Sequence, residues 1–364
     1  MHLWGPVPAM KIEKDLVAED ARKQKPEDVL SIPFGSVFTD HMLSMKYIGG
    51  KWLRPRIHSF APLSLNPAAL CLHYGQGIFE GMKAYRRGER ILLFRPEKNF
   101  ERLRASAERM VMPALDVDIA LECLKELLRV ERDWIPQVKG SSLYVRPTLL
   151  GTEAKLGVKP SSEYLFFIIL SPVGPYFKGG FAPVKIYVST EHVRAVRGGV
   201  GAAKAMGNYA ASLYAGTEAA KVGYSQVLWL DAIERRYLEE AGTMNVFVKF
   251  DDELATPPLS GTILPGITRD SVIALAHDMG IRITERKISI DEVLEGIKSG
   301  KVEEMFGCGT AAIIAPIGSL WYRKSTFDIS GGQIGHLTQT LYDELTGIQS
   351  GEREDPHGWV VEVS

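Results

Sequence analysis

Short apolar runs alternate along the chain with longer segments whose apolar residues recur at helical spacing. The run YLFFIIL, residues 164–170, is apolar throughout and predicts a strand covered on both faces. In ILLFRPEKNFERL a strand leads into Arg95, and Pro96 suits the first turn of a helix. The second half gives three successions of strand, turn and helix, and Ser289 with Glu292 forms a capping-box pattern in the third. These patterns predict a mixed α/β (α+β) fold.

The stretch SPVGPYFKGGFAP, residues 171–183, is the best linker candidate, because prolines flank a Gly-Gly pair within it. A chain of 364 residues also exceeds what one hydrophobic core usually accommodates. We therefore expect a small N-terminal domain at 1–172, an interdomain loop at 173–183 and a larger domain at 184–364. Residues 1–30 are expected to include a loose extension, with Met10 an alternative to Met1 as the start.

Composition and charge exclude several classes of partner. Lys and Arg total 43 and Asp and Glu total 44, for a net charge of -1, and the charges are interspersed, so no nucleic-acid or membrane partner is expected. The start lacks the features of a signal peptide and the longest apolar run is too short to span a bilayer, which predicts a cytoplasmic protein. Three cysteines stand far apart, which predicts neither a disulfide framework nor a metal site.

One lysine stands in a run of small residues, GVGAAKAMGNY, residues 199–209. Its small neighbours leave room for a flat ligand, and a desolvated lysine can lose its proton and attack an aldehyde. Ala203 and Ala205 occupy the places where a phosphate-binding P-loop needs Gly and Ser or Thr, and the lysine itself breaks a dinucleotide fingerprint. Lys204 is therefore a candidate Schiff-base lysine for pyridoxal phosphate, against the ordinary alternative of a surface lysine.

Pyridoxal phosphate requires a carboxylate at its ring nitrogen and donors at its phosphate. The sequence LEEAGTMN places Glu239 and Glu240 at the end of an apolar strand, where alternation should turn one into a site and the other outward. The turn in SGTILPGITRD opens a helix whose first residues, Ile267 and Thr268, would present free N–H groups to an anion. A further hydroxyl and a further cation could come from Thr310 and Arg102.

Taken together, GVGAAKAMGNY, LEEAGTMNVFV, LPGITRDSV and FGCGTAA resemble the branched-chain amino acid aminotransferases. In the first half, SVFTDHML, LHYGQGIFEGMKAYR, LFRPEKNFERL, YVRPTLLGTEAKLGV and SPVGPYFKGG are similar to motifs of the same family. The resemblance spans about residues 30–345. It implies a two-domain fold-type IV enzyme that uses pyridoxal 5'-phosphate and works as a homodimer or larger homo-oligomer. The implied reaction moves an amino group from L-leucine, L-isoleucine or L-valine to 2-oxoglutarate, which gives branched-chain 2-oxo acids and L-glutamate.

The resemblance also implies roles for individual residues. Lys204 matches the Schiff-base lysine, Tyr209 the tyrosine at the phenolic oxygen of the cofactor, and Glu240 rather than Glu239 the partner of the ring nitrogen. Four residues match the phosphate ligands, namely Arg102, Ile267, Thr268 and Thr310. A further site arginine is matched by Arg194. The residues that match the apolar substrate walls are Phe34, Tyr74, Phe79, Tyr144 and Tyr176, and those at the substrate carboxylate are Thr243 and Ala311.

The second substrate and the departures from the family pattern leave alternatives open. Arg146 matches the arginine that takes the glutamate side chain, although it could instead hold its own loop. Ala312 and Ala315 stand where some members carry Cys-x-x-Cys, so a thiol switch of that kind is not expected, and only an exposed Cys308 would be redox-active. Rival interpretations are a D-amino acid aminotransferase, an aminodeoxychorismate lyase, a pyridoxal phosphate carrier without turnover, and a nicotinamide-dependent dehydrogenase, which the missing fingerprint disfavours.

Overall fold

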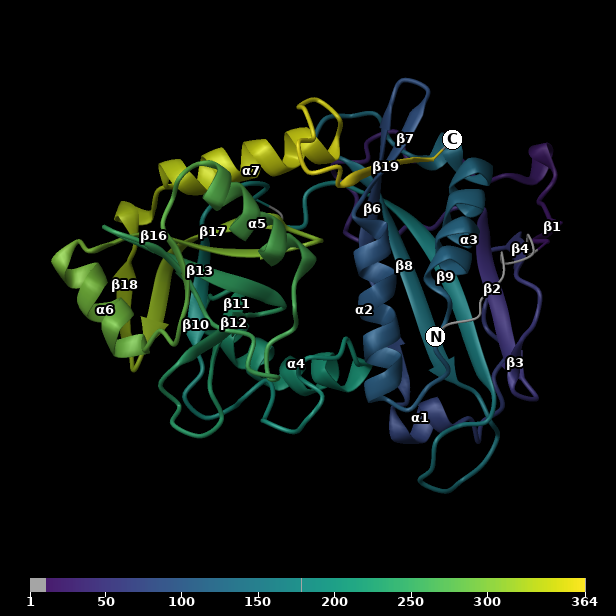
Figure 1. The fold of residues 1–364 in the computed structure, drawn as a ribbon, viewed down its shortest axis with the longest axis horizontal. Coiled ribbons are helices and arrows are strands. Elements are labelled where there is room, and N and C mark those ends of the chain that lie inside the picture. The colour runs from purple at the N-terminus through teal and green to yellow at the C-terminus, as the bar shows by residue number, and fades with distance from the viewer. Residues whose placement is uncertain (1–10, 178, 364) are drawn as a thin grey trace, which may run out of the picture. The chain divides into compact units, whose positions relative to one another are not determined.

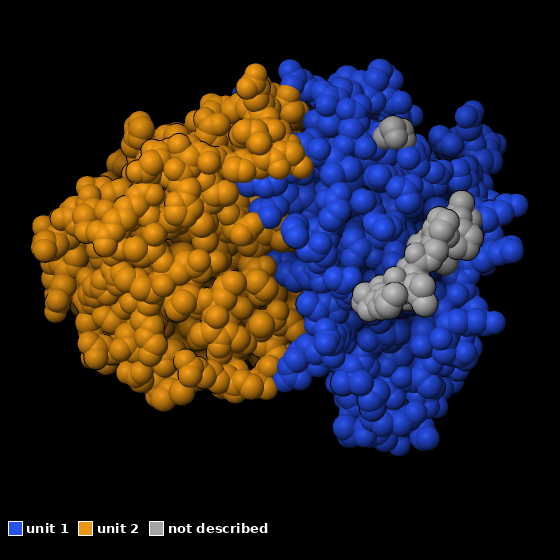
Figure 2. Space-filling model, in the orientation of Figure 1, with its two compact units in different colours: residues 1–174, 359–364 blue, residues 175–358 orange. Residues whose placement is uncertain are grey.

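The computed structural model describes residues 11–177 and 179–363. Met1, Met10 and position 178 of the expected interdomain loop lie outside the described residues. The chain forms two compact units, Met1–Gly174 with Trp359–Ser364, and Pro175–Gly358 (Figure 2). Each unit has its own sheet, so the mixed α/β class predicted from the apolar pattern is confirmed.

Unit 1 is built on a ten-stranded sheet of the described residues in the order β1-β4-β2-β9-β8-β6-β7-β19, with β3 beside β2 and β5 beside β8. Its strands are β1 Glu13–Asp15, β2 His41–Ile48, β3 Lys51–Trp52, β4 Arg56–Ser59, β5 Gly77–Phe79, β6 Met82–Arg87, β7 Arg90–Phe94, β8 Ser142–Gly151, β9 Tyr164–Val173 and β19 Val360–Val363. Its helices are α1 Leu70–Tyr74, α2 Pro96–Arg109 and α3 Val117–Val130.

The core of unit 1 lies between this sheet and two helices. Strands β8 and β9 pair along ten positions each, and their mostly buried residues explain the continuous apolar run interpreted as a covered strand. Helices α2 and α3 lie side by side and pack on the sheet (Figure 1). As the sequence predicted, α2 begins at Pro96, whose fixed φ suits a first helical turn.

The C-terminal strand differs from the predicted domain division, which placed all of 184–364 in the second domain. Strand β19 pairs antiparallel with β7 of unit 1, with Val363 opposite Ile91. Strand β7 would otherwise end the sheet with unpaired backbone groups, and β19 covers that edge. The last residues therefore belong to the N-terminal unit, although they follow the whole of the second one.

Unit 2 is built on a nine-stranded sheet of the described residues in the order β12-β11-β10-β17-β16-β13-β14-β15, with β18 beside β17. Its strands are β10 Val184–Val188, β11 Gln226–Leu230, β12 Leu238–Ala241, β13 Met244–Phe250, β14 Leu254–Thr256, β15 Ile283–Glu285, β16 Val302–Gly309, β17 Ile313–Tyr322 and β18 Ser325–Asp328. Its helices are α4 Met206–Lys221, α5 Ile267–Asp278, α6 Ile290–Ser299 and α7 His336–Gln349.

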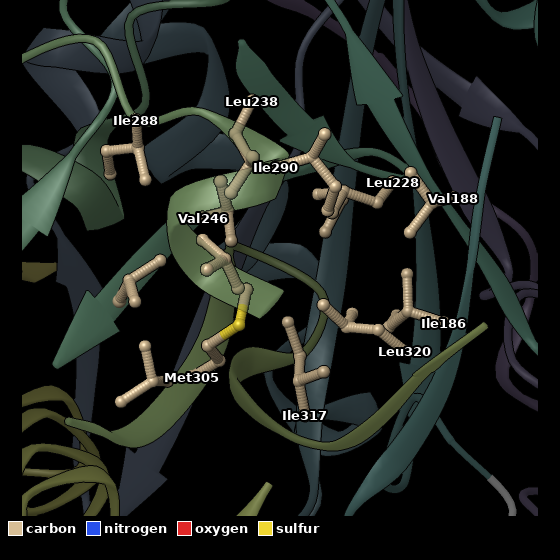
Figure 3. Packing of buried hydrophobic residues seen from close by; sticks show 14 of the residues in the cluster. Ile186, Val188, Leu228, Leu238, Val246, Ile288, Ile290, Met305, Ile317 and Leu320 are labelled. Atoms are coloured by element: carbon tan, nitrogen blue, oxygen red, sulfur yellow. The ribbon is translucent and has the colours of Figure 1, made fainter. Parts of the chain in front are cut away.

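A closed ring of strands forms the core of unit 2. Strand β12 pairs with β13 as well as β11, so the path from β12 through β11, β10, β17, β16 and β13 returns to its start. Each of these strands contributes apolar side chains to one buried cluster, which Figure 3 shows from close by. A turn at Gly242, whose φ of 63° favours glycine, separates β12 from β13. This closure fixes where the strand ends and their turns lie.

The starts of two helices in unit 2 can be compared with the sequence. The capping box at α6 is confirmed, since Ser289 and Glu292 bond each other's backbone N–H groups. Helix α4 begins at Met206, two residues after Lys204. Within 11–177 and 179–363, no helix is long and apolar enough to cross a membrane. The same residues contain no group of three or more His, Cys, Asp or Glu side chains that could hold a metal ion.

Candidate active site

Lys204 lies between a tight turn and the start of α4. The Asn208 amide fixes this turn, because its Nδ2 donates to the carbonyl oxygens of Val200 at 2.8 Å and Ala203 at 3.0 Å. The partly buried Lys204 then extends its Nζ to 3.0 Å from the hydroxyl of Tyr209. The structure therefore brings together the predicted lysine and the predicted tyrosine, with the amine held by the phenol.

The small residues before Lys204 have a structural reason that the sequence did not reveal. A Cβ at Gly201 would lie 2.6 Å from the Cβ of Ala195 and closer still to the carbonyl oxygen of Thr262. Neither atom could move away cheaply, since one is a short side chain and the other belongs to the backbone. At Gly201, at least, the small residue lets the lysine loop pack against the segment around Thr262, which is a different requirement from room for a ligand.

Glu240 is the buried carboxylate of the site. Its Oε1 accepts a hydrogen bond from the backbone N–H of Leu264 at 3.0 Å and a longer one from Asn245 at 3.4 Å. Its Oε2 lies 2.5 Å from Nε of Arg194, a charge contact in which the N–H does not point at the oxygen. Burial raises the pKa of Glu240 to about 7, against the lowering effect of the charges of Arg194 and Lys204.

The neighbouring acid, Glu239, corrects the expectation that one of the two glutamates points outward. Both are buried, with Glu239 5% exposed and Glu240 3% exposed. Oε1 of Glu239 accepts a hydrogen bond from the Thr262 hydroxyl at 2.5 Å, and burial raises the pKa of Glu239. Pro257, Pro258, Ser260, Thr262 and Ile263 lie beside Glu239 around a small cavity and shield that face of β12. Alternation holds, but the side chains on both faces of the strand are buried here.

Arg194 connects the lysine loop to the acid strand. Its Nη2 donates to the carbonyl oxygen of Gly201 at 3.1 Å and to that of Thr262, while its Nε contacts Glu240. Its guanidinium is thus held by two backbone segments and one carboxylate, all within unit 2. The arginine predicted as a further site residue therefore contacts the predicted partner of the ring nitrogen.

Helix α5 begins at Ile267, and no side chain caps its first turn. The first N–H groups of a helix have no acceptor within it, so Ile267 and Thr268 are placed as an anion site requires. A Cβ at Gly266 would collide with Oδ1 of Asn245, which shows how closely this helix start approaches the residue beside Glu240. The helix start that is predicted to bind the phosphate therefore lies next to the buried carboxylate of Glu240.

Two turns meet at one end of the strand ring. Thr243 lies in the turn between β12 and β13, and Thr310 and Ala311 lie in the turn between β16 and β17. Asn245 pairs with Cys308 in the ladder between β13 and β16, and a Cβ at Gly309 would lie 3.8 Å from the Thr243 carbonyl oxygen. The residues predicted at the substrate carboxylate and the phosphate are therefore neighbours.

In unit 1, most of the predicted substrate wall forms one cluster on β5, β8 and the loop before β2. The rings of Phe34 and Tyr144 meet edge to face with centroids 4.9 Å apart. The Tyr144 hydroxyl accepts a hydrogen bond from Nη2 of Arg146 at 3.0 Å. The Arg146 guanidinium lies 4.6 Å from the ring centroid of Phe79. Aromatic rings and one cation are therefore combined in one cluster.

The remaining predicted residues are Tyr74, Tyr176 and Arg102. Tyr74 ends α1 and is 44% exposed, and Tyr176 belongs to unit 2, where its ring packs on Phe177 at 4.9 Å. Arg102 on α2 is not a solvated surface arginine, because its side chain is only 9% exposed. Its Nε and Nη2 donate to the two carboxylate oxygens of buried Glu80 at 2.7 and 2.9 Å, a bidentate pair that orients the guanidinium.

Three residues beside predicted site residues were not expected from the sequence: Thr262, Asn245 and Lys83. The register places Lys83 directly opposite Tyr144, and burial lowers the pKa of Lys83 to about 8. Alternation within GMKAYR was the available signal, since it puts this lysine on the face of its strand opposite Met82 and Ala84, which are buried. No local signal marks Thr262 or Asn245, whose partners are distant in sequence.

Cys308 lies in β16 and is 1% exposed. Burial raises the pKa of its thiol well above the usual range, so the reactive thiolate is suppressed. The alternative of an exposed, redox-active Cys308 is therefore not supported by its surroundings.

Comparison with known proteins shows which family and which relatives the sequence is similar to. Residues 77–320 match the family model for amino-transferase class IV. The chain is 52% identical over 345 residues to branched-chain-amino-acid aminotransferase 2 of Bacillus subtilis, covering 94% of this chain and 95% of the other. It is 48% identical to the branched-chain-amino-acid aminotransferase of Mycolicibacterium smegmatis, covering 93% and 94%.

Solved structures give the same result for the fold. The crystal structure of the Escherichia coli branched-chain amino acid aminotransferase matches with a TM-score of 0.72 and 29% identity, covering 88% of this chain and 99% of that one. The branched-chain aminotransferase of the thermophilic archaeon Thermoproteus uzoniensis, solved with norvaline, matches with a TM-score of 0.70 and 27% identity, covering 88% and 99%. The fold-type IV architecture expected from the motifs is confirmed. The chain belongs to the class IV aminotransferase family.

Proposed function

We propose that this chain transfers the amino group of L-leucine, L-isoleucine or L-valine reversibly to 2-oxoglutarate, with pyridoxal 5'-phosphate bound at Lys204. Two contacts in unit 2 together support the proposal most directly. The Lys204 amine is hydrogen-bonded to the Tyr209 hydroxyl, and the buried Glu240 carboxylate contacts the Arg194 guanidinium. The names of relatives about half identical over nearly the full chain support the choice of substrates.

The residues present fit this cofactor. An amine for its aldehyde, a phenol beside that amine, a buried carboxylate for its ring nitrogen and an uncapped helix start for its phosphate are the donors it requires. When bound, the cofactor supplies a ring that accepts the electrons left when the α-carbon loses its proton. The candidate phosphate ligands are Arg102, Ile267, Thr268 and Thr310.

Glu240 and Lys204 would manage the two protons of the reaction. With a pKa of about 7, Glu240 can hold a proton or release it to the ring nitrogen near neutral pH, and Arg194 stabilises its ionised form. The Lys204 amine would move the proton that leaves the substrate α-carbon, in the role of a general base and then acid. The hydrogen bond to Tyr209 fixes the direction of that amine.

The cluster on unit 1 supports the choice of two kinds of substrate. Phe34, Phe79 and Tyr144 offer an apolar wall for an aliphatic side chain. Arg146 offers a cation for the side-chain carboxylate of glutamate, and its buried Nε has no hydrogen-bond partner among the described residues. A bound carboxylate would satisfy that donor. We infer from the family resemblance that Tyr74 and Tyr176 also contact the aliphatic side chain, and that Thr243 and Ala311 hold the substrate α-carboxylate.

The test is transamination by the purified protein with added pyridoxal phosphate. L-leucine with 2-oxoglutarate should give glutamate and 4-methyl-2-oxopentanoate, whereas D-alanine should give no product. Product from D-alanine but not from L-leucine would point to a D-amino acid aminotransferase. A cofactor absorption band that L-leucine leaves unchanged would indicate a carrier without turnover.

We propose, from the family resemblance, that the chain forms a homodimer or larger homo-oligomer and resides in the cytoplasm. Light scattering coupled to size-exclusion chromatography tests the assembly. A mass of 40.3 kDa would be that of a single chain and would contradict it.

A further inference from the structure

The segment of residues 260–266 contacts the lysine loop, Arg194 and Glu240 in unit 2. The Thr262 carbonyl oxygen accepts from Arg194 and packs against Gly201 of the lysine loop. Two residues later, the Leu264 N–H donates to Glu240 and the Leu264 carbonyl accepts from Asn245 at 3.0 Å. The segment then leads directly into α5. Its position therefore sets the distances among these groups.

Glu239 anchors this segment. It is 5% exposed, and its Oε1 accepts the Thr262 hydroxyl at 2.5 Å, while the Ser260 hydroxyl lies 2.9 Å from that of Thr262. The next residue on the strand, Glu240, accepts from the Leu264 N–H. Adjacent glutamates on one strand thus hold the same segment at positions two residues apart.

We propose that Glu239, through the Thr262 hydroxyl, is a positioning residue that holds Arg194 against Glu240. The chain of contacts runs from the Glu239 carboxylate to the Thr262 hydroxyl, and from the Thr262 carbonyl to the Arg194 guanidinium and on to Glu240. Its importance for catalysis rests on the proposed function, in which Glu240 serves the ring nitrogen.

If Glu239 holds Arg194 in place through Thr262, the pKa of Glu240 should change when this chain of contacts is broken. The charge of Arg194 is the largest influence that lowers the pKa of Glu240, which burial raises. Loosening Thr262 should let Arg194 withdraw, so the pKa of Glu240 should rise further. A residue that only stabilises the fold would change the unfolding midpoint and leave this titration in place.

The first test uses Thr262→Val, which keeps the branched shape and removes the hydroxyl. Thr256→Val is the matched control, because Thr256 is also buried in unit 2 and its hydroxyl donates to the Val246 carbonyl at 2.8 Å, outside this chain of contacts. Infrared spectroscopy of the cofactor-free protein, with Glu240→Gln as the reference, follows the carboxyl of Glu240 as pH changes.

We expect the pKa of Glu240 to rise by about one pH unit in Thr262→Val. We also expect kcat to fall about tenfold, which is the effect of losing one charged hydrogen bond, while KM changes less than about twofold. Thr256→Val should show neither change. Equal Glu240 titrations in the two variants would overturn the proposal. Because the infrared measurement needs no cofactor, it decides the positioning role even if the transamination test fails.

The second test uses the cavity behind Glu239. A cavity of about 210 Å³ is lined by Glu239, Thr262 and Pro258, by the cations Arg197 and Lys287 and by the acids Asp231 and Glu234. Its volume has room for a small anion in place of the Glu239 carboxylate. Glu239→Gly should lose activity, and formate should restore it severalfold by replacing the carboxylate, whereas chloride at equal ionic strength should not. Equal effects of formate and chloride would contradict a role for the carboxylate at this position.

Discussion

Replacing Glu240 by Gln should change how the stability of the cofactor-free protein depends on pH. In the native protein the side chain is 3% exposed, held by Leu264 and paired with Arg194, and its pKa is about 7. In the unfolded chain the pKa of a glutamate is 4.5. The folded protein therefore binds this proton more tightly than the unfolded chain does. Gln keeps the shape and an acceptor for the Leu264 N–H but cannot ionise.

The sign and size follow from linkage. A pKa raised on folding contributes stability that is fully present below pH 4.5 and is lost as pH rises through about 7. One pH unit of pKa difference corresponds to about 1.4 kcal/mol, so the full loss is about 3 kcal/mol, most of it between pH 5 and pH 8. Other groups titrate in the same range, and the difference between wild type and Glu240→Gln removes their contribution.

Urea unfolding of both proteins at several pH values between 5 and 8, followed by circular dichroism, measures this difference. The free energy of unfolding of the wild type should fall relative to the variant by about 2 to 3 kcal/mol over this range. Parallel pH profiles would refute the reasoning, because they would mean that the carboxyl has its ordinary pKa in the native state. A wild type that gains stability relative to the variant as pH rises would show that Arg194 outweighs burial.

Further predictions concern substrate choice, oxidation and local stability. Arg146→Ala should lower kcat/KM for the half-reaction with glutamate or 2-oxoglutarate by the equivalent of about 1.5 to 3 kcal/mol. The half-reaction with leucine should stay nearly unchanged, because leucine has no distal carboxylate. Equal losses in both half-reactions would assign Arg146 to loop structure. Mild peroxide should inactivate the wild type and Cys308→Ser equally little, because the thiol is buried and its pKa is raised. Ser289→Ala should lower the free energy of unfolding by about 1 kcal/mol, because the capping box with Glu292 is lost; an unchanged urea midpoint would contradict this.

The parts of the site that could be predicted are those with a local signal. A lysine among small residues and two acids at the end of an apolar strand mark Lys204 and Glu240, and both lie beside turns of unit 2 as expected. The helix starts at Pro96 and Ser289 also follow from residues within one turn of each. Capping and turn chemistry depend on near neighbours, so the sequence alone carries them.

The parts that could not be predicted depend on partners far away in the chain. Glu239 is buried because the segment ending at Thr262, more than twenty residues later, covers its strand. The C-terminal strand joins β7 because that sheet edge is open, a fact that no pattern near residue 360 encodes. The small residue Gly201 was expected to leave room for a ligand. In the structure it is required because the backbone of Thr262 lies too close for a Cβ atom.

The most direct test of the central claim is to locate the residue that holds the cofactor. Borohydride treatment of the protein loaded with pyridoxal phosphate fixes the cofactor covalently to its lysine, and peptide mass spectrometry identifies the site. We predict that the label lies on Lys204, and that Lys204→Ala takes up no label and loses multiple turnovers with L-leucine and 2-oxoglutarate. A label on another lysine, or sustained turnover by Lys204→Ala, would contradict the account.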